Sequence, residues 1–152
     1  MTNPVSVIEK AYAKVNLTLE ILGKRRDGYH DLASVMQTVN LFDTVTVSEA
    51  DSIIVDCDGL EIDTEMNLAT KAASVLKNRT GIRSGAKILI KKSIPVSAGL
   101  GGGSSDAAAT LRGLNRIWKL GLSVDELADI AASVGSDVPF LLRGGTALVR
   151  GR

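Results

Sequence analysis

Four glycines occupy five positions, Gly99 to Gly103, within the stretch SIPVSAGLGGGSSDAAATL. Glycine loses more conformational freedom on folding than any other residue, so such a run is expected where the backbone takes left-handed angles or where something approaches it closely. A strand-like segment, AKILIKKS, precedes the run, and an alanine-rich segment of helical periodicity follows it. The run therefore predicts a strand–loop–helix unit around which the rest of the chain has to fold.

The start of the predicted helix offers a site for an anion. The N–H groups there have no partner within the helix, and the helix dipole adds a partial positive charge. Ser104 or Ser105 is expected to cap the helix, with Asp106 in its first turn. A bare glycine backbone would let phosphate oxygens reach these N–H groups.

Two common nucleotide-binding loops are excluded. A Walker A loop needs a lysine directly before its Ser or Thr, and no Lys precedes Ser104; a dinucleotide fingerprint needs a sixth-position glycine, and counting from Gly99 that position is Ser104. A flexible surface loop or close helix–strand packing would also explain a bare glycine cluster. The preceding strand, the serines and Pro95, which stiffens the entry, favour a phosphate-binding loop.

Hydrophobic periodicity predicts strands before and between helices. Strands are expected over residues 15–21, 32–41, 43–50, 52–58, 86–93 and 145–151, with a tight turn at Asp27-Gly28. Three helices are expected, the first with Leu68, Ala72, Val75 and Leu76 on one face and Gly81 as its end, the second with Ala107, Leu111, Leu114 and Trp118, and the third with Val124, Leu127, Ala131 and Val134 and Gly135 as its end. Ser123 and Glu126 form the capping box of the third helix. This order predicts a single α+β domain.

The first predicted strand has one apolar and one polar face. Val15, Leu17, Leu19 and Ile21 alternate with Asn16, Thr18 and Glu20. The same parity places Lys14 beside Asn16 on the polar face, and we expect that face to point away from the core.

Charge and composition restrict the class of partner. Over 152 residues the net charge is +1, with 18 basic and 17 acidic residues, which gives no reason to expect nucleic acid or an anionic membrane as a partner. The sequence has no apolar run of membrane-spanning length, and its first ten residues lack a signal peptide's apolar segment. The single cysteine, Cys57, cannot form an internal disulfide and is expected at a buried strand position. A cytoplasmic location fits these features.

Three stretches together resemble the GHMP kinase family. PVSAGLGGGSSDAAATL is similar to that family's glycine-rich second motif, and AYAKVNLTLEILGKRRDGYHDL and GSDVPFLLRGGTAL are similar to two further segments of one of its kinases. The resemblance implies a ribosomal protein S5 domain 2-like fold for residues 1–152, as the first domain of a two-domain kinase. It also implies ATP-dependent phosphorylation of the 2-hydroxyl of a cytidine diphosphate-linked methylerythritol, in the non-mevalonate route to isoprenoids.

The resemblance implies roles for individual residues. Lys14 and Asp137 would be the catalytic pair, with the aspartate accepting the hydroxyl proton and the lysine stabilising developing charge. The triphosphate of ATP would be wrapped by Pro95, Val96, Ser97, Ala98, Gly99, Leu100, Gly101, Gly102, Gly103, Ser104 and Ser105. Tyr29 and His30 would recognise the cytidine, while Asn16 would lie near the substrate. Asn67 would lie near the adenine, and Mg²⁺ would accompany ATP with its protein ligands unassigned.

Simpler readings of the same residues stay open. Lys14 could be an ordinary exposed strand lysine, Asp137 could cap the turn before Pro139, and a lone His30 beside a turn is commonly structural or solvated. Family members are close to twice this length, so a C-terminal domain that completes the cleft is expected to be missing and phosphoryl transfer by this chain alone to be much reduced. The alternatives are another GHMP kinase, acting on homoserine or a mevalonate, or a nucleotide-binding module without catalysis.

Overall fold

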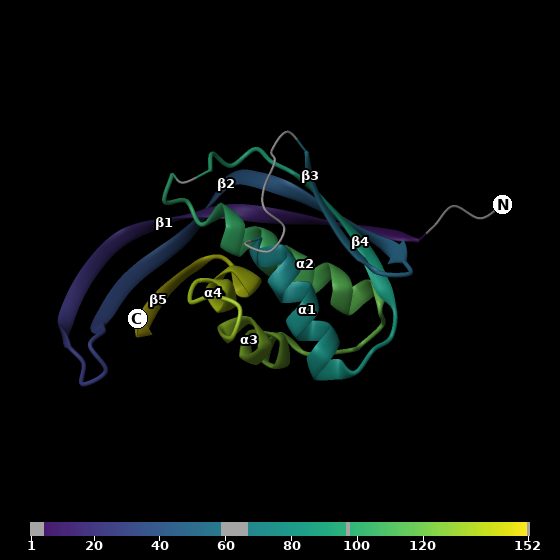
Figure 1. Cartoon of the computed structure of the whole chain (residues 1–152). Coiled ribbons are helices and arrows are strands. Elements are labelled where there is room, and N and C mark those ends of the chain that lie inside the picture. Colours follow the sequence, from purple (N-terminus) through teal and green to yellow (C-terminus); the bar gives the residue numbers. More distant parts are fainter. Residues whose placement is uncertain (1–4, 59–66, 97, 152) are drawn as a thin grey trace.

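A computed structural model of the chain describes residues 5–58, 67–96 and 98–151 (Figure 1). Within these residues one five-stranded sheet has the order β1-β2-β4-β3, with β5 also paired to β2. The elements in chain order are β1 (Ser6–Lys24), β2 (His30–Ala50), β3 (Ile53–Asp58), α1 (Leu68–Thr80), β4 (Gly85–Lys91), α2 (Gly102–Ile117), α3 (Val124–Ala132), α4 (Val138–Arg143) and β5 (Thr146–Gly151). The β3–β4 pair is parallel, and all other pairs are antiparallel. The predicted α+β class is confirmed.

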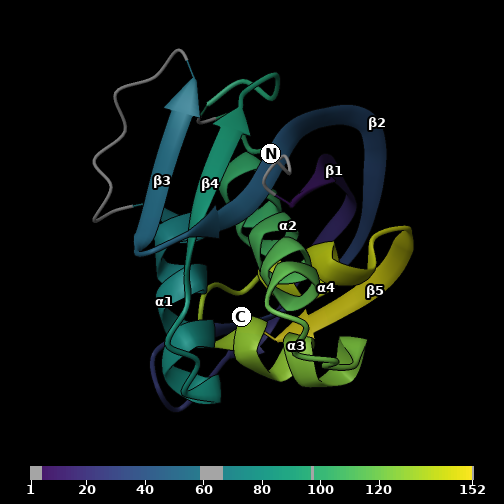
Figure 2. The ribbon, with the colours of Figure 1, turned by 90° about the vertical axis from the view of Figure 1, so that its right-hand side faces the viewer.

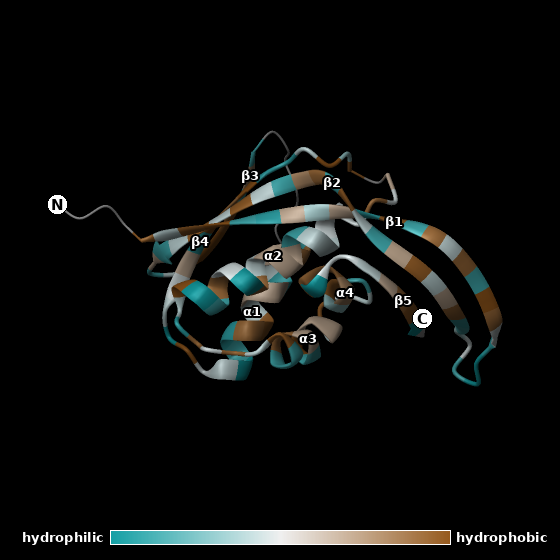
Figure 3. Cartoon of the chain, turned by 180° about the vertical axis from the view of Figure 1, so that it is seen from behind, coloured by the Kyte–Doolittle hydropathy of each residue, from teal (hydrophilic) through white to brown (hydrophobic). Residues whose placement is uncertain are grey.

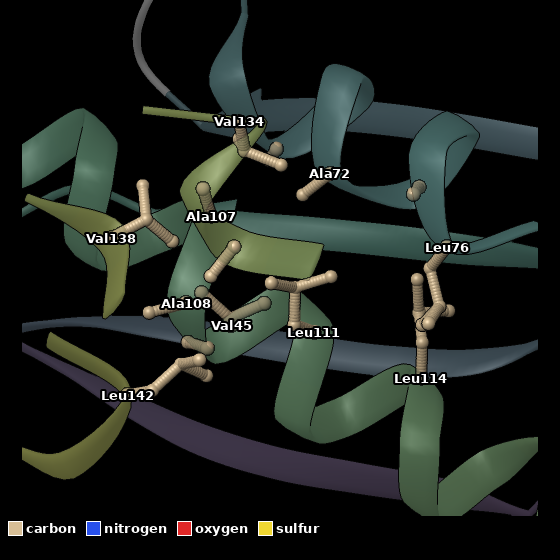
Figure 4. Packing of buried hydrophobic residues seen from close by; sticks show 14 of the residues in the cluster. Val45, Ala72, Leu76, Ala107, Ala108, Leu111, Leu114, Val134, Val138 and Leu142 are labelled. Atoms are coloured by element: carbon tan, nitrogen blue, oxygen red, sulfur yellow. The ribbon is translucent and has the colours of Figure 1, made fainter. Parts of the chain in front are cut away.

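All four helices lie on one side of the curved sheet (Figures 1 and 2). Helix α2 lies between the sheet and the other helices, and it packs against β1, β2, α1 and α4. Its buried face carries Ala107, Ala108, Leu111 and Leu114, which meet Val45 of β2 and Leu76 of α1 (Figure 4). Removing these apolar side chains from water is the main favourable contribution to the fold.

Strand β2 corrects one prediction. Two strands were expected over residues 32–41 and 43–50, whereas the structure has one strand of 21 residues. It stays continuous because Phe42 remains paired with Tyr12 of β1, so the chain has no need to turn there. The predicted turn at Asp27-Gly28 is confirmed, with Gly28 at a φ of 90°.

The predicted polar face of β1 is exposed at Asn16, Thr18 and Glu20, as expected, but the prediction is wrong for Lys14. Lys14 is buried, with 6% of its surface exposed, while Leu19 and Ile21 are 61% and 68% exposed. The β1–β2 register shifts between Tyr12 and Lys14, so Ala13 and Lys14 are both buried and the simple alternation fails. Beyond Lys14 the hairpin extends past the helices (Figure 3), and Leu19 and Ile21 on its β1 arm are exposed.

The helices follow the sequence signals more closely. Gly81 ends α1 in the left-handed conformation with a φ of 70°, and both bonds of the Ser123–Glu126 capping box are present at α3. Helix α3 ends earlier than expected, at Ala132, and Val124 is 48% exposed rather than part of the core face. At the first position of a helix a side chain can lie outside the stripe that the periodicity defines. As expected for a core position, Trp118 is buried.

Candidate functional site

The glycine-rich loop is attached directly to β1. The backbone N–H of Lys14 donates to the carbonyl of Leu100 at 2.9 Å, and the Ser105 hydroxyl donates to the carbonyl of Tyr12 at 2.7 Å. Gly101 has a φ of 70°, and a Cβ built on it would lie 3.0 Å from Cγ of Lys14. A glycine is therefore required at position 101 both by the backbone angle and by the approach of the lysine.

The start of α2 differs from the expected cap. The helix begins at Gly102 with Gly101 at its N-cap, and no side-chain hydrogen bond caps it. Ser104 and Ser105 lie inside the first turn, and Asp106 lies beyond it. The helix starts earlier because the left-handed Gly101 turns the chain into helical geometry before the serines are reached. The N–H groups of the first turn are consequently left without a side-chain cap, as an anion site requires.

A cavity of about 390 Å³ opens over this helix start. It is lined by the loop on one side and by the start of α1 on the other, and its lining residues are Asn67, Leu68, Lys92, Pro95, Val96, Ala98, Gly99, Leu100, Gly101, Gly102, Gly103, Ser104 and Asp106. Ten of the positions expected to bind ATP therefore border one cavity. Ser105 is instead bonded to β1, and Ser97 lies outside the described residues.

Lys14 and Asp137, expected as a pair, lie together. The Nζ of Lys14 is 3.8 Å from Oδ2 of Asp137, and the two side chains are 7% and 31% exposed. Asp137 is the N-cap residue of α4, yet its side chain makes no capping hydrogen bond. A partly exposed carboxylate held beside a buried lysine and free of a capping role can accept a proton from a bound hydroxyl.

The loop is also held by a buried charge cluster that we did not predict. The Nζ of Lys92 contacts Oδ2 of Asp43 at 2.5 Å and Oδ2 of Asp106 at 2.9 Å. Oδ1 of Asp43 accepts the backbone N–H groups of Ser93 and Ile94 at 2.6 and 2.8 Å. We call Asp43, Lys92 and Asp106 the lysine cluster; it joins β2, the entry to the loop and helix α2.

The electrostatics of the lysine cluster are unequal. Burial alone would raise the pKa of Asp43, but hydrogen bonds, from Asp106 first, lower it. Burial first, and then the hydrogen bond with Asp43, raise the pKa of Asp106 to about 8. Burial alone would lower the pKa of Lys92, but its hydrogen bonds to both carboxyl groups raise it. The pKa shifts of the two carboxyl groups thus have opposite directions, upward for Asp106 and downward for Asp43.

The alternation of residues along two strands contains a sequence signal for this cluster. Asp43 shares its parity with Val45 and Val47, and Lys92 shares its parity with Ile88 and Ile90, so both charges fall on core-facing positions. Buried charges require partners, so the two would have been expected to meet.

The remaining expected site residues are divided between the cavity and the hairpin. Asn67 borders the cavity and also caps α1, its side chain accepting the N–H of Ala69 at 2.8 Å. Asn16 accepts a hydrogen bond from the hydroxyl of Ser34 at 2.9 Å. His30 is exposed at the base of the hairpin turn, paired with Lys24.

Tyr29 borders a second cavity rather than the first. This cavity measures about 580 Å³, and its other lining residues are Lys71, Ala132, Ser133, Val134, Gly135, Ser136 and Pro139. Because residues 132–136 and Pro139 flank Asp137 in sequence, the hairpin tip faces the segment that carries the aspartate. The cavity at Tyr29 and the cavity at the glycine-rich loop are thus separate, and neither is lined by Lys14 or Asp137.

Metal-ligand clusters and membrane-spanning helices are both absent from the described residues. Within residues 5–58, 67–96 and 98–151, no group of three or more His, Cys, Asp or Glu side chains is arranged to hold a metal ion. In the same part of the chain, none of the helices has the length and apolar character needed to cross a bilayer.

Fold and site together define an α+β domain with an uncapped, glycine-rich helix start beside a lysine–aspartate pair. The sequence profile of the GHMP kinases N terminal domain matches residues 67–145. The chain therefore belongs to the GHMP kinase family. Its first motif, with Lys14, lies outside that match and is joined to it through the Leu100 hydrogen bond.

Several relatives share one described activity. The chain is 54% identical over 149 residues to a 4-diphosphocytidyl-2-C-methyl-D-erythritol kinase of Bacillus pumilus, and 53% identical over 148 residues to that of Caldicellulosiruptor saccharolyticus. The matches cover 96% and 95% of this chain but 52% and 51% of the relatives. The chain therefore spans about half the length of the curated relatives it matches.

Solved structures agree with the fold. A crystal structure of 4-(cytidine 5'-diphospho)-2C-methyl-D-erythritol kinase is similar with a TM-score of 0.81 at 39% identity, covering 95% of this chain and 52% of that one. A mevalonate kinase of Methanococcus jannaschii is similar with a TM-score of 0.71 at 19% identity, covering 97% of this chain and 54% of that one, which bears on the fold alone.

Proposed function

We propose that this chain is the nucleotide-binding half of an ATP-dependent kinase that phosphorylates the 2-hydroxyl of 4-diphosphocytidyl-2-C-methyl-D-erythritol. The observation that carries the proposal is the lysine–aspartate pair: Lys14 is 3.8 Å from Asp137 through its side chain and is bonded to the glycine loop through its backbone. One residue thus links the phosphate loop to the carboxylate. The proposed substrate is supported by relatives described as this kinase, which are 54% and 53% identical along nearly the whole chain.

In the proposed reaction the loop holds the triphosphate. Backbone N–H groups at the start of α2 bind phosphate oxygens, and the helix dipole favours their negative charge. The left-handed Gly99 and Gly101, with φ of 74° and 70°, keep side chains away from this path. Phosphoryl transfer passes through a loose transition state, and catalysis depends mainly on positioning and charge stabilisation. A loop held to β1 by hydrogen bonds can supply both.

The proton would move to Asp137. Its carboxylate accepts the proton of the 2-hydroxyl as the oxygen attacks the terminal phosphorus, and the leaving group is ADP. Lys14, beside this carboxylate, stabilises the charge that develops on the substrate oxygen. Tyr29 would stack on the cytosine while His30 and Asn16 bind polar groups of the substrate. In this scheme the reacting hydroxyl lies between the two cavities.

Mg²⁺ would enter with the nucleotide. The ion characteristically keeps several waters and binds through phosphates and one or two carboxylates, and it neutralises phosphate charge. The acidic side chains nearest the loop are occupied by lysines in this structure, Asp137 by Lys14 and Asp106 by Lys92. We therefore assign no described residue as its ligand.

The experiment that tests the proposal is Asp137→Asn. Turnover of ATP with the cytidine diphosphate-linked substrate is expected to fall by about 10²- to 10⁴-fold, because general-base catalysis is lost. Affinity for a non-hydrolysable ATP analogue, measured by calorimetry, should remain because the loop is intact. Asp129→Asn, on the exposed side of α3, is the matched control.

Equal turnover in Asp137→Asn would remove this aspartate from the mechanism. A substrate panel that adds homoserine and mevalonate separates this kinase from others of the family. Phosphorylation of either one, without the cytidine nucleotide, would overturn the proposed substrate while leaving the kinase class intact.

A further inference from the structure

The lysine cluster has one polar atom that its neighbours leave unsatisfied. Asp106 is 5% exposed, and its Oδ2 receives Lys92, but its Oδ1 has no hydrogen-bond partner. A buried carboxylate oxygen without a donor is unfavourable, because desolvation is not compensated. Lys92 holds the carboxyl groups of Asp43 and Asp106 at one ammonium group, at 2.5 and 2.9 Å. A proton on Asp106 would remove its uncompensated charge and reduce the repulsion between the two carboxyl groups.

We propose that Asp106 is a positioning residue which holds a proton shared with Asp43, so that the lysine cluster is neutral where it meets the phosphate cavity. The charges are then +1 on Lys92, −1 on Asp43 and zero on Asp106. The raised pKa of Asp106, about 8, agrees with this assignment. The proposal rests on the proposed function in one respect, that the cavity binds a polyphosphate.

Because the lysine cluster borders the phosphate cavity, the protonation of Asp106 is expected to affect ATP binding. Lys92 and Asp106 both border the cavity, and a Cβ built on Gly102 would lie 3.2 Å from Nζ of Lys92. The lysine thus sits directly under the helix start that would receive phosphate. If Asp106 ionised, a net negative charge would appear beside the phosphate oxygens, in a partly desolvated site where charge repulsion is strong.

The geometry of the loop depends on the same groups. Asp43 fixes the entry to the loop through the N–H groups of Ser93 and Ile94, and Asp106 belongs to the helix at its exit. Lys92 bonds both, so both ends of the loop are held by one ammonium group. A proton on Asp106 relieves the repulsion between the two carboxyl groups. It therefore also stabilises the hydrogen bonds that hold the loop beside β2.

Other elements around Asp106 contribute few charges. From β1, Lys14 contacts the loop at Gly101 but is paired with Asp137. From β3, burial raises the pKa of the Cys57 thiol, so this side chain adds no charge, and Asp58 is exposed. The buried residues of the neighbouring helices are apolar: Ala69, Ala72, Ala73 and Leu76 in α1, and Val138, Phe140, Leu141 and Leu142 in α4. Lys92 and Asp43 are therefore the groups that set the proton's affinity.

The test is the pH dependence of ATP affinity between pH 7 and pH 9.5, measured by calorimetry on the wild-type chain and on Asp106→Asn. The phosphates of ATP titrate below this range, since their second pKa is about 6. Wild-type affinity is expected to weaken by about five- to tenfold from pH 7.5 to pH 9, as one proton is lost from the binding form. Asp106→Asn has an uncharged side chain of nearly the same shape at every pH. Its affinity for ATP should therefore not change over this range. Asp56→Asn, on exposed β3, is the matched control and should follow the wild type.

The outcomes separate this proposal from the proposed function. If ATP fails to bind the wild type at any pH, the kinase proposal fails. If ATP binds but its affinity for the wild type does not change with pH, only the shared proton is overturned. The same holds if the affinity of Asp106→Asn for ATP weakens with rising pH as that of the wild type does. If Asp106→Asn does not fold, infrared spectroscopy of the wild type decides: a carboxylic-acid carbonyl band present at pH 7 and lost above pH 9 supports the proton, and its absence at pH 7 overturns it.

Discussion

Gly101 is a residue at which one added carbon atom would disturb the site. It closes the glycine loop in the left-handed conformation, and the side chain of Lys14 passes where a β-carbon would stand. The same lysine bonds the loop through its backbone and reaches Asp137 through its ammonium group. A change at position 101 is therefore expected to affect both the loop and the Lys14–Asp137 pair.

Replacing Gly101 by alanine should separate these effects. We expect the left-handed backbone to cost about 1–2 kcal/mol of unfolding free energy, and the methyl group to displace Lys14 and lower turnover at least tenfold. Gly121→Ala is the control, because Gly121 has a φ of 67° and a methyl group added there would meet nothing within 4 Å. Urea unfolding and a coupled kinase assay measure both changes. Similar turnover in the two variants would contradict the role of the Lys14 contact.

The proton on Asp106 also predicts how stability varies with pH. Its pKa in the folded chain, about 8, lies above its usual 3.8, so the folded state binds the proton more tightly. The resulting stabilisation is complete below about pH 4 and is lost as the pH rises toward 8. Asp43 has the opposite sign, because its lowered pKa removes stability only as the pH falls below its usual value of 3.8.

Thermal unfolding between pH 5 and pH 8.5 isolates the Asp106 contribution. The melting temperature of the wild type should decline across this range relative to Asp106→Asn, in which the titrating carboxyl group is absent. Parallel curves for the two proteins would be inconsistent with a raised pKa at this position.

Among the elements, α2 determines where the site lies. It approaches β2 closely at Gly113, where a Cβ would be 2.6 Å from Cγ2 of Val47, and the Arg112 guanidinium donates to the carbonyls of Lys10 and Leu141. The helix start, and with it the phosphate cavity, is placed by these contacts with β1, β2 and α4.

Gly113→Ala tests this close approach. Alanine favours a helix by about 1 kcal/mol over glycine, but its methyl group would overlap Val47, and such overpacking costs about 1–3 kcal/mol. We expect a net loss of up to about 2 kcal/mol in urea unfolding. The variant Val47→Ala should make the same Gly113→Ala change neutral or stabilising, because the overlap is removed. A loss of stability that is equal in both backgrounds would show that the contact is unimportant.

Periodicity and cap signals predicted most of these elements, but not their curvature. The capping box at Ser123 and the left-handed Gly81 depend on residues close in sequence, so local patterns were sufficient to predict them. The register shift before Lys14 depends on how β1 meets β2, which periodicity within one strand does not specify. For the same reason the lysine cluster, whose members are brought together from positions 43, 92 and 106, was missed while the loop that it holds was found.

For the molecule as a whole, the β1–β2 hairpin projects beyond the helices (Figure 3). Leu19 and Ile21 of β1 are 61% and 68% exposed, although both are paired with residues of β2. Figure 3 shows hydrophobic bands along this hairpin beyond the helices. Tyr29, expected to bind cytidine, lies at its tip. We propose that the second half found in the relatives covers this hairpin and completes the substrate cleft.

The chain by itself should therefore bind nucleotide yet transfer phosphate slowly. Its phosphate cavity is formed within the described residues, so affinity for an ATP analogue is expected to be within about tenfold of that of the Bacillus pumilus relative. Its substrate hydroxyl would be poorly positioned, and misplacement of a reacting group by about 1 Å can cost a factor of about 10² in rate. Steady-state assays of both proteins, with the relative's C-terminal half added in a further sample, measure the difference. Turnover equal to that of the relative, without the added half, would mean that one domain alone holds the hydroxyl in line with the phosphate and that the apolar hairpin serves another purpose.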